Sequence, residues 1–207
     1  MRTLLAILLS TITCSAQWNL PYKPSPPPTT WDPNNKAASV VLSGNNLAEY
    51  TPNSSADNAN VISTTSASIS QKVYFEVVLD SAATPQTAAL IGVASSSLVE
   101  IACYFCFAGG SFKTTGGTPV GYGSTWGIGD VISVSLDGTG AITFYNNGVS
   151  QGVAYTGLTG PFFAYAAGVE DNKQQWTASF GILSGDPRTA SLRASLVVAG
   201  YTGLGRG

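Results

Sequence analysis

The sequence contains no histidine and few charged side chains, and both shortages restrict the chemistry open to it. Histidine is the usual general base near neutral pH, activates serine and cysteine nucleophiles, and is the commonest metal ligand. Asp, Glu, Lys and Arg make up 10% of the 207 residues, against roughly 25% in ordinary soluble domains. The nine basic residues form no cluster, whereas nucleic-acid binding needs a dense basic surface. We therefore expect no nucleic-acid partner, no cofactor and no catalytic activity.

Glycine, proline and uncharged polar residues are abundant instead. The chain has 23 glycines and 11 prolines, and 44% of its residues are hydrophobic. Glycine and proline are typical of turns. Because charged residues are few, the polar surface must come from Ser, Thr, Asn, Gln and Gly, which suit sheets and turns better than helices. This balance predicts sheets connected by turns around a substantial core.

The first sixteen residues have the pattern of a secretory signal peptide. Arg2 precedes an apolar run over residues 3–9, and small residues follow at 14–16. The run is too short for a membrane span of about 20 residues, although a buried N-terminal strand or helix remains an alternative. Residues 17–30 are rich in proline and predict a stiff, extended spacer. We expect a secreted or extracellular protein, or one on a virion surface.

Two cysteines, Cys103 and Cys106, remain if the signal peptide is removed. In an oxidising compartment they could form a local disulfide, provided that the two residues between them make a tight turn. A redox-active pair needs a helix N-terminus to activate its thiolate, and zinc needs about four ligands. The sequence shows neither, so we expect either a structural disulfide or two buried thiols.

Alternation of apolar and polar side chains predicts several half-buried β-strands, each with a polar face toward solvent. It is clearest over residues 72–80, 130–137, 141–145 and 175–180. The pair Asn147-Gly148 predicts a tight hairpin turn. Short strands with frequent turn signals, and no helical periodicity before residue 186, predict an all-β sandwich or barrel. The expected inward side chains are Val73, Phe75, Val77, Leu79, Ile132, Val134, Leu136, Ile142, Phe144, Trp176, Ala178 and Phe180.

The order of motifs along these strands resembles the SPRY (B30.2-like) family. The matching segments are Lys72–Val77 (KVYFEV), Ile91–Ala94 (IGVA), Gly129–Asp137 (GDVISVSLD), Ile142–Val149 (ITFYNNGV), Gly160–Phe163 (GPFF) and Ser179–Gly181 (SFG). Phe75, Ser133 and Ala164 depart from the usual family residues. The stretch 31–43 is similar to a variant found in bacteriophage and prophage proteins.

This resemblance covers residues 31–181. Residues 182–207 form a C-terminal extension whose role the sequence does not indicate. The resemblance implies a two-sheet antiparallel β-sandwich of the concanavalin-like jelly-roll type. It also implies a non-catalytic module that binds a protein or a surface glycan through its loops, on a phage particle or an exported prophage protein. A structural decoration protein of a virion is an alternative function.

Four aromatic residues between the best-predicted strands are candidates for ligand binding: Tyr104, Phe112, Tyr122 and Trp126. Glycine pairs interrupt regular strands there, so some of these rings are expected to project from loops, where exposed aromatics anchor proteins or stack on sugars. The alternative for each ring is ordinary core packing.

Carboxylates give weaker predictions. A carbohydrate-active enzyme would need two acids across a cleft, and Glu76, Glu100 and Glu170 are the residues to test. The adjacent pair Glu170-Asp171 is better explained by a solvated loop. Asp137 begins a turn, and a calcium loop needs several carboxylates at fixed spacing, so no metal site is expected.

Overall fold

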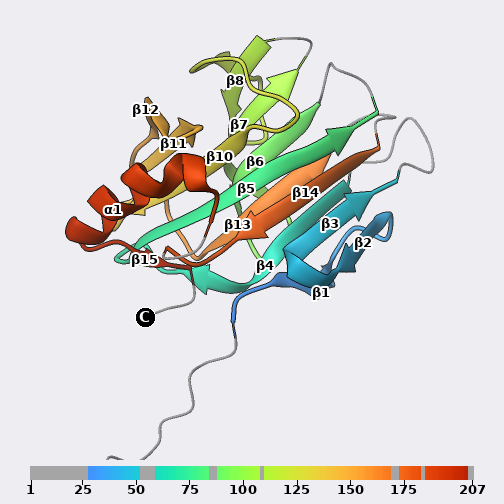
Figure 1. Ribbon diagram of the computed structural model, residues 1–207, viewed down its shortest axis with the longest axis horizontal. Coiled ribbons are helices and arrows are strands. Elements are labelled where there is room, and N and C mark those ends of the chain that lie inside the picture. The colour runs from blue at the N-terminus through green and yellow to red at the C-terminus, as the bar shows by residue number, and fades with distance from the viewer. Residues whose placement is uncertain are drawn as a thin grey trace, which may run out of the picture.

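The chain folds into two antiparallel β-sheets packed face to face, with one short helix on an outer face (Figure 1). The computed structural model describes residues 28–51, 59–83, 88–107, 110–168, 173–182 and 185–204. The expected signal peptide and most of the proline-rich spacer lie outside these residues, as does the pair Glu170-Asp171. The predicted all-β sandwich is confirmed.

The two sheets differ in size, and their strands are interleaved along the chain. The seven-stranded sheet has the order β1 (Trp31–Lys36), β4 (Ala59–Ala67), β13 (Phe162–Gly168), β6 (Ala89–Ala94), β7 (Glu100–Phe107), β8 (Gly110–Thr114) and β9 (Val120–Gly121). The path through the eight-stranded sheet is β12 (Val149–Tyr155), β11 (Ile142–Asn146), β10 (Val131–Asp137), β5 (Lys72–Ala82), β14 (Gln174–Ser179), β3 (Leu47–Tyr50) and β2 (Val40–Ser43).

The remaining elements are short. The 3-10 turn η1 spans Gly44–Asn46 and joins β2 to β3. Near the C-terminus, η2 (Pro187–Thr189) leads into α1 (Ala190–Val198), and β15 (Thr202–Gly203) then pairs in parallel with β5. Within the described part of the chain, α1 is the single α-helix, and no helix there is long and apolar enough to cross a membrane.

The core lies between the sheets and contains every inward side chain predicted from the alternation. Those twelve residues all belong to one buried cluster. Trp31 belongs to it and packs in edge-to-face geometry with Phe180 at a centroid distance of 5.2 Å. The period of two therefore placed the correct face of each strand toward the other sheet.

The predicted Asn-Gly turn is also confirmed. Asn147 and Gly148 have φ values of 48° and 83° and connect β11 to β12. Both angles are positive, which asparagine and glycine tolerate better than other residues. The Asn147 side chain accepts a hydrogen bond from the Val131 amide at 3.0 Å, so the turn is tied to the start of β10.

One expectation about β5 and β10 is wrong. Their second face was expected to meet solvent, yet Tyr74, Glu76, Ser133 and Ser135 on that face are buried. The C-terminal segment, residues 185–204, covers it: Tyr74 packs in a cluster that includes Leu196 of α1. Figure 1 shows the helix crossing the eight-stranded sheet. The extension whose role the sequence did not reveal is thus an integral part of the fold.

The sequence left open a disulfide or two separate thiols at Cys103 and Cys106, and the structure has no bond between them. Cys103 and Cys106 are both buried thiols. They lie three residues apart on β7, and such side chains point to opposite faces of a strand. Cys103 packs on the outer side of the seven-stranded sheet, whereas the Cys106 Sγ lies 2.6 Å from the Trp126 carbonyl oxygen in the core. The structure therefore has two buried thiols, and burial raises the pKa of the Cys103 thiol.

Candidate functional site

Three of the four predicted aromatic residues come together at one end of the core. The Tyr104 ring lies 5.3 Å from Tyr122 and 5.7 Å from Trp126, measured between ring centroids. Tyr104 and Trp126 are buried, so for these two the core-packing alternative holds. Phe112 lies apart and packs against Phe105 at 6.3 Å. Phe112 and Tyr122 are half-buried, and ligand contact by either stays a prediction.

Tyr122 and Lys113 join the two sheets along the edge of β12. The Tyr122 hydroxyl donates to the Gly152 carbonyl at 2.5 Å, and the Lys113 ammonium donates to the Ala154 carbonyl at 2.5 Å. The ammonium also lies 4.7 Å from the centroid of the Tyr155 ring. Lys113 of β8 and Tyr122, which follows β9, thereby satisfy carbonyls of an edge strand of the other sheet, which protects that edge from non-specific pairing. Burial raises the pKa of Tyr122 to about 12, so its hydroxyl keeps the donated proton to a higher pH than an exposed tyrosine does.

The loop that follows β9 is held at several points. The Tyr104 hydroxyl donates to the Ser124 carbonyl, and the Ser124 amide donates to Oε1 of Gln151 at 2.8 Å. Asn146 donates from its Nδ2 to the Thr125 carbonyl at 3.2 Å. Buried Trp126 then fixes the loop to the core. A loop ordered in this way loses little conformational entropy when it meets a ligand.

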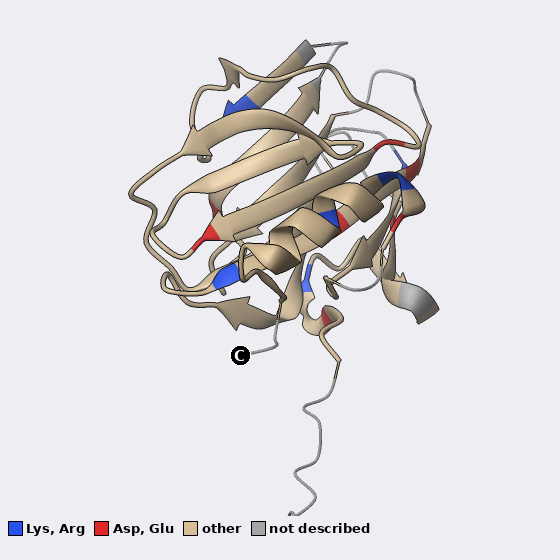
Figure 2. Ribbon diagram, turned by 60° about the vertical axis from the view of Figure 1, so that its left-hand side comes forward, with Lys and Arg blue, Asp and Glu red and all other residues tan. Residues whose placement is uncertain are grey.

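We call residues 115–128 together with residues 149–153 of β12 the seam surface. Residues 115–121 and 123–125 are all exposed. Large apolar side chains are exposed across this surface, and they are Val120, Ile128, Val149 and Val153. Residues 114–129 and 138–160 contain no Asp, Glu, Lys or Arg. In Figure 2 the charged residues are scattered over the fold without a large patch of one sign. The seam surface therefore offers apolar and uncharged polar contacts.

Of the candidate acids that the structure describes, Glu76 and Glu100 lie on different sheets and do not face one another as a pair. Glu76 is buried beneath the C-terminal segment and accepts hydrogen bonds from the Tyr74 hydroxyl, Thr189 and Arg193. Glu100 is half-buried on β7 of the other sheet, and burial raises its pKa. Asp137 accepts hydrogen bonds from the Thr139 and Ala141 amides, as a turn residue does. Within the described ranges, no three His, Cys, Asp or Glu residues gather in a way that could hold a metal ion.

A family model for the SPRY domain matches residues 72–181, which is more than half of the chain. The chain belongs to the SPRY family. Domains of this family are generally binding modules rather than enzymes. No curated protein sequence is significantly similar to the chain.

Solved SPRY domains share the fold at low sequence identity. The SPRY domain of human HERC1 is 13% identical with a TM-score of 0.59, over 72% of this chain and 96% of that one. Another human SPRY domain is 16% identical with a TM-score of 0.54, over 72% and 97%. The PSpry domain of TRIM65 is 15% identical with a TM-score of 0.52, over 73% and 91%. These likenesses establish the sandwich and say nothing about the ligand.

Sequence reasoning missed two residues that organise the site of this SPRY domain. Lys113 carries the sole charge between Glu100 and Asp130, and that isolation was a usable signal. Gln151 had no such signal, because uncharged polar residues are common throughout the chain. Its side chain contacts Ser124 across 27 residues of sequence.

Proposed function

We propose that this SPRY domain binds an uncharged protein segment through the seam surface. The observation that carries the proposal is the exposure of Val120, Ile128, Val149 and Val153 on a surface whose own residues, 115–128 and 149–153, carry no charge. Exposed aliphatic groups around a rigid loop favour protein contacts, which gain free energy from the burial of apolar area. The absence of charge also means that binding should depend little on salt concentration.

A protein partner is favoured over a glycan by the position of the aromatic rings. Sugars bind to exposed ring faces, yet Tyr104 and Trp126 are buried. The Tyr122 ring packs in edge-to-face geometry with Tyr104 and Phe144. Tyr104 and Trp126 therefore support the loop from inside the core, and of the four candidate rings only the half-buried Phe112 and Tyr122 are left to meet a sugar.

A random peptide library and a glycan array, each probed with the purified chain, test this proposal. Val149→Ser combined with Val120→Ser should abolish the enrichment of uncharged peptides that the wild-type chain shows. Val41→Ser is the matched control: Val41 is 65% exposed and Val149 is 66% exposed, and their strands β2 and β12 lie at opposite ends of the same sheet. Glycan binding without peptide binding would overturn the protein partner, and binding to neither library would overturn the proposed function.

We also propose that the chain acts outside the cell, on an exported prophage protein or a phage particle. The support is the signal-like sequence of residues 1–16, the low charge and the resemblance of residues 31–43 to phage variants. Expression of the full chain in a bacterial host should yield a mature protein that begins at Gln17. A cytoplasmic product that retains Met1 would argue against export.

A further inference from the structure

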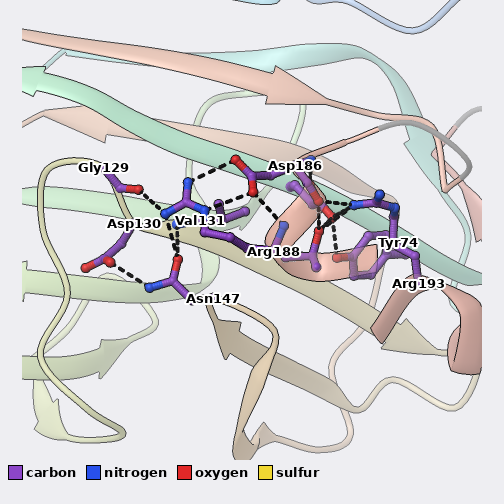
Figure 3. A network of polar contacts seen from close by, with 10 residues as sticks. Tyr74, Gly129, Asp130, Val131, Asn147, Asp186, Arg188 and Arg193 are labelled. Carbon is purple, nitrogen blue, oxygen red and sulfur yellow. Dashed lines mark hydrogen bonds and ion pairs between the residues drawn. The ribbon is translucent and has the colours of Figure 1, made fainter. Parts of the chain in front are cut away.

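Arg188 of the C-terminal segment contacts both chain elements that flank the seam surface. Its Nη1 donates to the Gly129 carbonyl at 2.7 Å and to Oδ1 of Asn147 at 3.2 Å (Figure 3). Gly129 directly follows residues 115–128, and Asn147 begins the turn into β12. One side chain therefore bridges the end of the loop and the start of the strand that together form the surface.

The guanidinium of Arg188 is itself held in place. Its Nε and Nη2 donate to the two carboxylate oxygens of Asp186, each at 2.9 Å. Such a bidentate pair fixes the plane of the guanidinium as well as its position. The Asp186 amide in turn donates to Oε2 of buried Glu76 at 3.0 Å. Arg188 is thus anchored through Asp186 to β5 in the middle of the eight-stranded sheet.

Asn147 also links the end of the loop to the β11–β12 turn through Asp130. Its Nδ2 donates to Oδ1 of Asp130 at 2.7 Å, and Oδ2 of Asp130 accepts from the Gly127 amide at 2.8 Å. Asn147 and Val131 also exchange hydrogen bonds, since the Asn147 amide donates to the Val131 carbonyl at 2.9 Å. The loop end and the β11–β12 turn therefore belong to one hydrogen-bonded unit, and Arg188 joins it from outside (Figure 3).

We propose that Arg188 is a positioning residue, which fixes the loop and β12 relative to each other so that they form a single binding surface. The C-terminal segment, which lies beyond the residues matched by the SPRY model, then helps to set the affinity for the ligand. The positioning claim stands on the contacts of Arg188, whereas its consequence for affinity rests on the proposed function.

The matched control for Arg188 is Lys173, which forms an ion pair of similar exposure elsewhere. Lys173 Nζ lies 2.7 Å from Glu49, and the exposed fraction of its side chain is 52%, against 46% for Arg188. Lys173→Ala removes an exposed cation and its pair without touching the loop or β12. Arg188→Lys keeps the charge but loses the planar fork that reaches Asp186, Gly129 and Asn147 together.

Amide hydrogen exchange and affinity test the proposal in separate arms. Arg188→Ala should exchange about tenfold faster at the Val131 and Asn147 amides, as expected for the loss of a charge-assisted hydrogen bond. Arg188→Lys should show the same acceleration, and Lys173→Ala should not. Unchanged exchange in Arg188→Ala, or an equal acceleration in Lys173→Ala, would overturn the positioning claim.

The affinity arm uses the peptide most enriched by the wild-type chain. Arg188→Ala should weaken its binding about tenfold, and Lys173→Ala should leave it unchanged. Faster exchange with unaltered affinity would show that Arg188 holds the loop without setting affinity, which contradicts the second half of the proposal. If the wild-type chain enriches no peptide, the proposed function fails, and the exchange arm still decides the role of Arg188.

Discussion

Arg193 Nη1 lies 3.0 Å from Oε1 of Glu76, whose side chain is 2% exposed. This ion pair joins α1 to the middle of the eight-stranded sheet across 117 residues of sequence. A buried carboxylate is tolerable when its oxygens are paired and hydrogen-bonded, and here the Tyr74 hydroxyl, Thr189 and the Asp186 amide supply further donors. The C-terminal segment therefore completes the environment that Glu76 requires.

Glu76→Gln should destabilise the protein strongly, because it leaves the Arg193 guanidinium unpaired in a nearly dry environment. Loss of one partner of a buried pair costs about 3–5 kcal/mol, measured as the free energy of unfolding in urea. Glu49→Gln, at an exposed pair with Lys173, is the control and should leave the urea midpoint unchanged. A Glu76→Gln variant as stable as the wild type would show that the pair contributes little.

Lys113→Met should loosen β12 while retaining the apolar part of the side chain. It removes the hydrogen bond to the Ala154 carbonyl and the contact with the Tyr155 ring. We expect a loss of about 1 kcal/mol in unfolding free energy, with faster amide exchange in β12. Lys113→Ala should cost more, since packing is lost as well. Equal stability of Lys113→Met and the wild type would mean that solvent replaces the hydrogen bond at no cost.

The hydrogen bond from the Tyr122 hydroxyl to the Gly152 carbonyl should be lost in strong alkali. Burial raises the pKa of Tyr122 from 10.0 to about 12, so the folded protein holds the phenolic proton more tightly than the unfolded chain does. This contribution to stability is fully present below pH 10 and is lost as the pH rises through 12. The difference in unfolding free energy between the wild type and Tyr122→Phe should be constant up to pH 10 and then shrink. A difference that grows above pH 10 would contradict the assigned direction.

The two described cysteines should behave as buried thiols. Without reductant, an alkylating reagent should modify neither Cys103 nor Cys106 in the folded protein, because both side chains are buried. In denaturant both should react, and peptide mass mapping would locate the two modifications. Protection of both cysteines in denaturant, reversed by reductant, would indicate the disulfide that the structure lacks.

The sequence predicted the core better than the surface, and the reason is the range of the contacts involved. Alternation along a strand is local, so Val73, Phe75, Val134 and Phe144 could be placed inward without knowledge of their neighbours. The turn at Asn147 was predictable for the same reason, because a positive φ selects residue types directly.

The outer face of β5 was not predictable, because its burial depends on α1, which follows more than a hundred residues later. Alternation predicts that Tyr74 and Glu76 face solvent, and no local pattern indicates that Arg193 covers them. The hydrogen bond from Lys113 to the Ala154 carbonyl likewise connects the two sheets across 41 residues of sequence. Contacts between segments far apart in the sequence determine the seam surface. Alternation of apolar and polar residues shows only which face of a single strand is buried.

The most direct test of the binding claim is amide hydrogen exchange of the chain with and without its most enriched peptide. Residues 115–128 and 149–153 should exchange more slowly in the complex, while β2, which carries Val41, should exchange at the same rate in both states. Slower exchange confined to β2, or to the exposed side of α1, with none over the seam surface, would contradict the account.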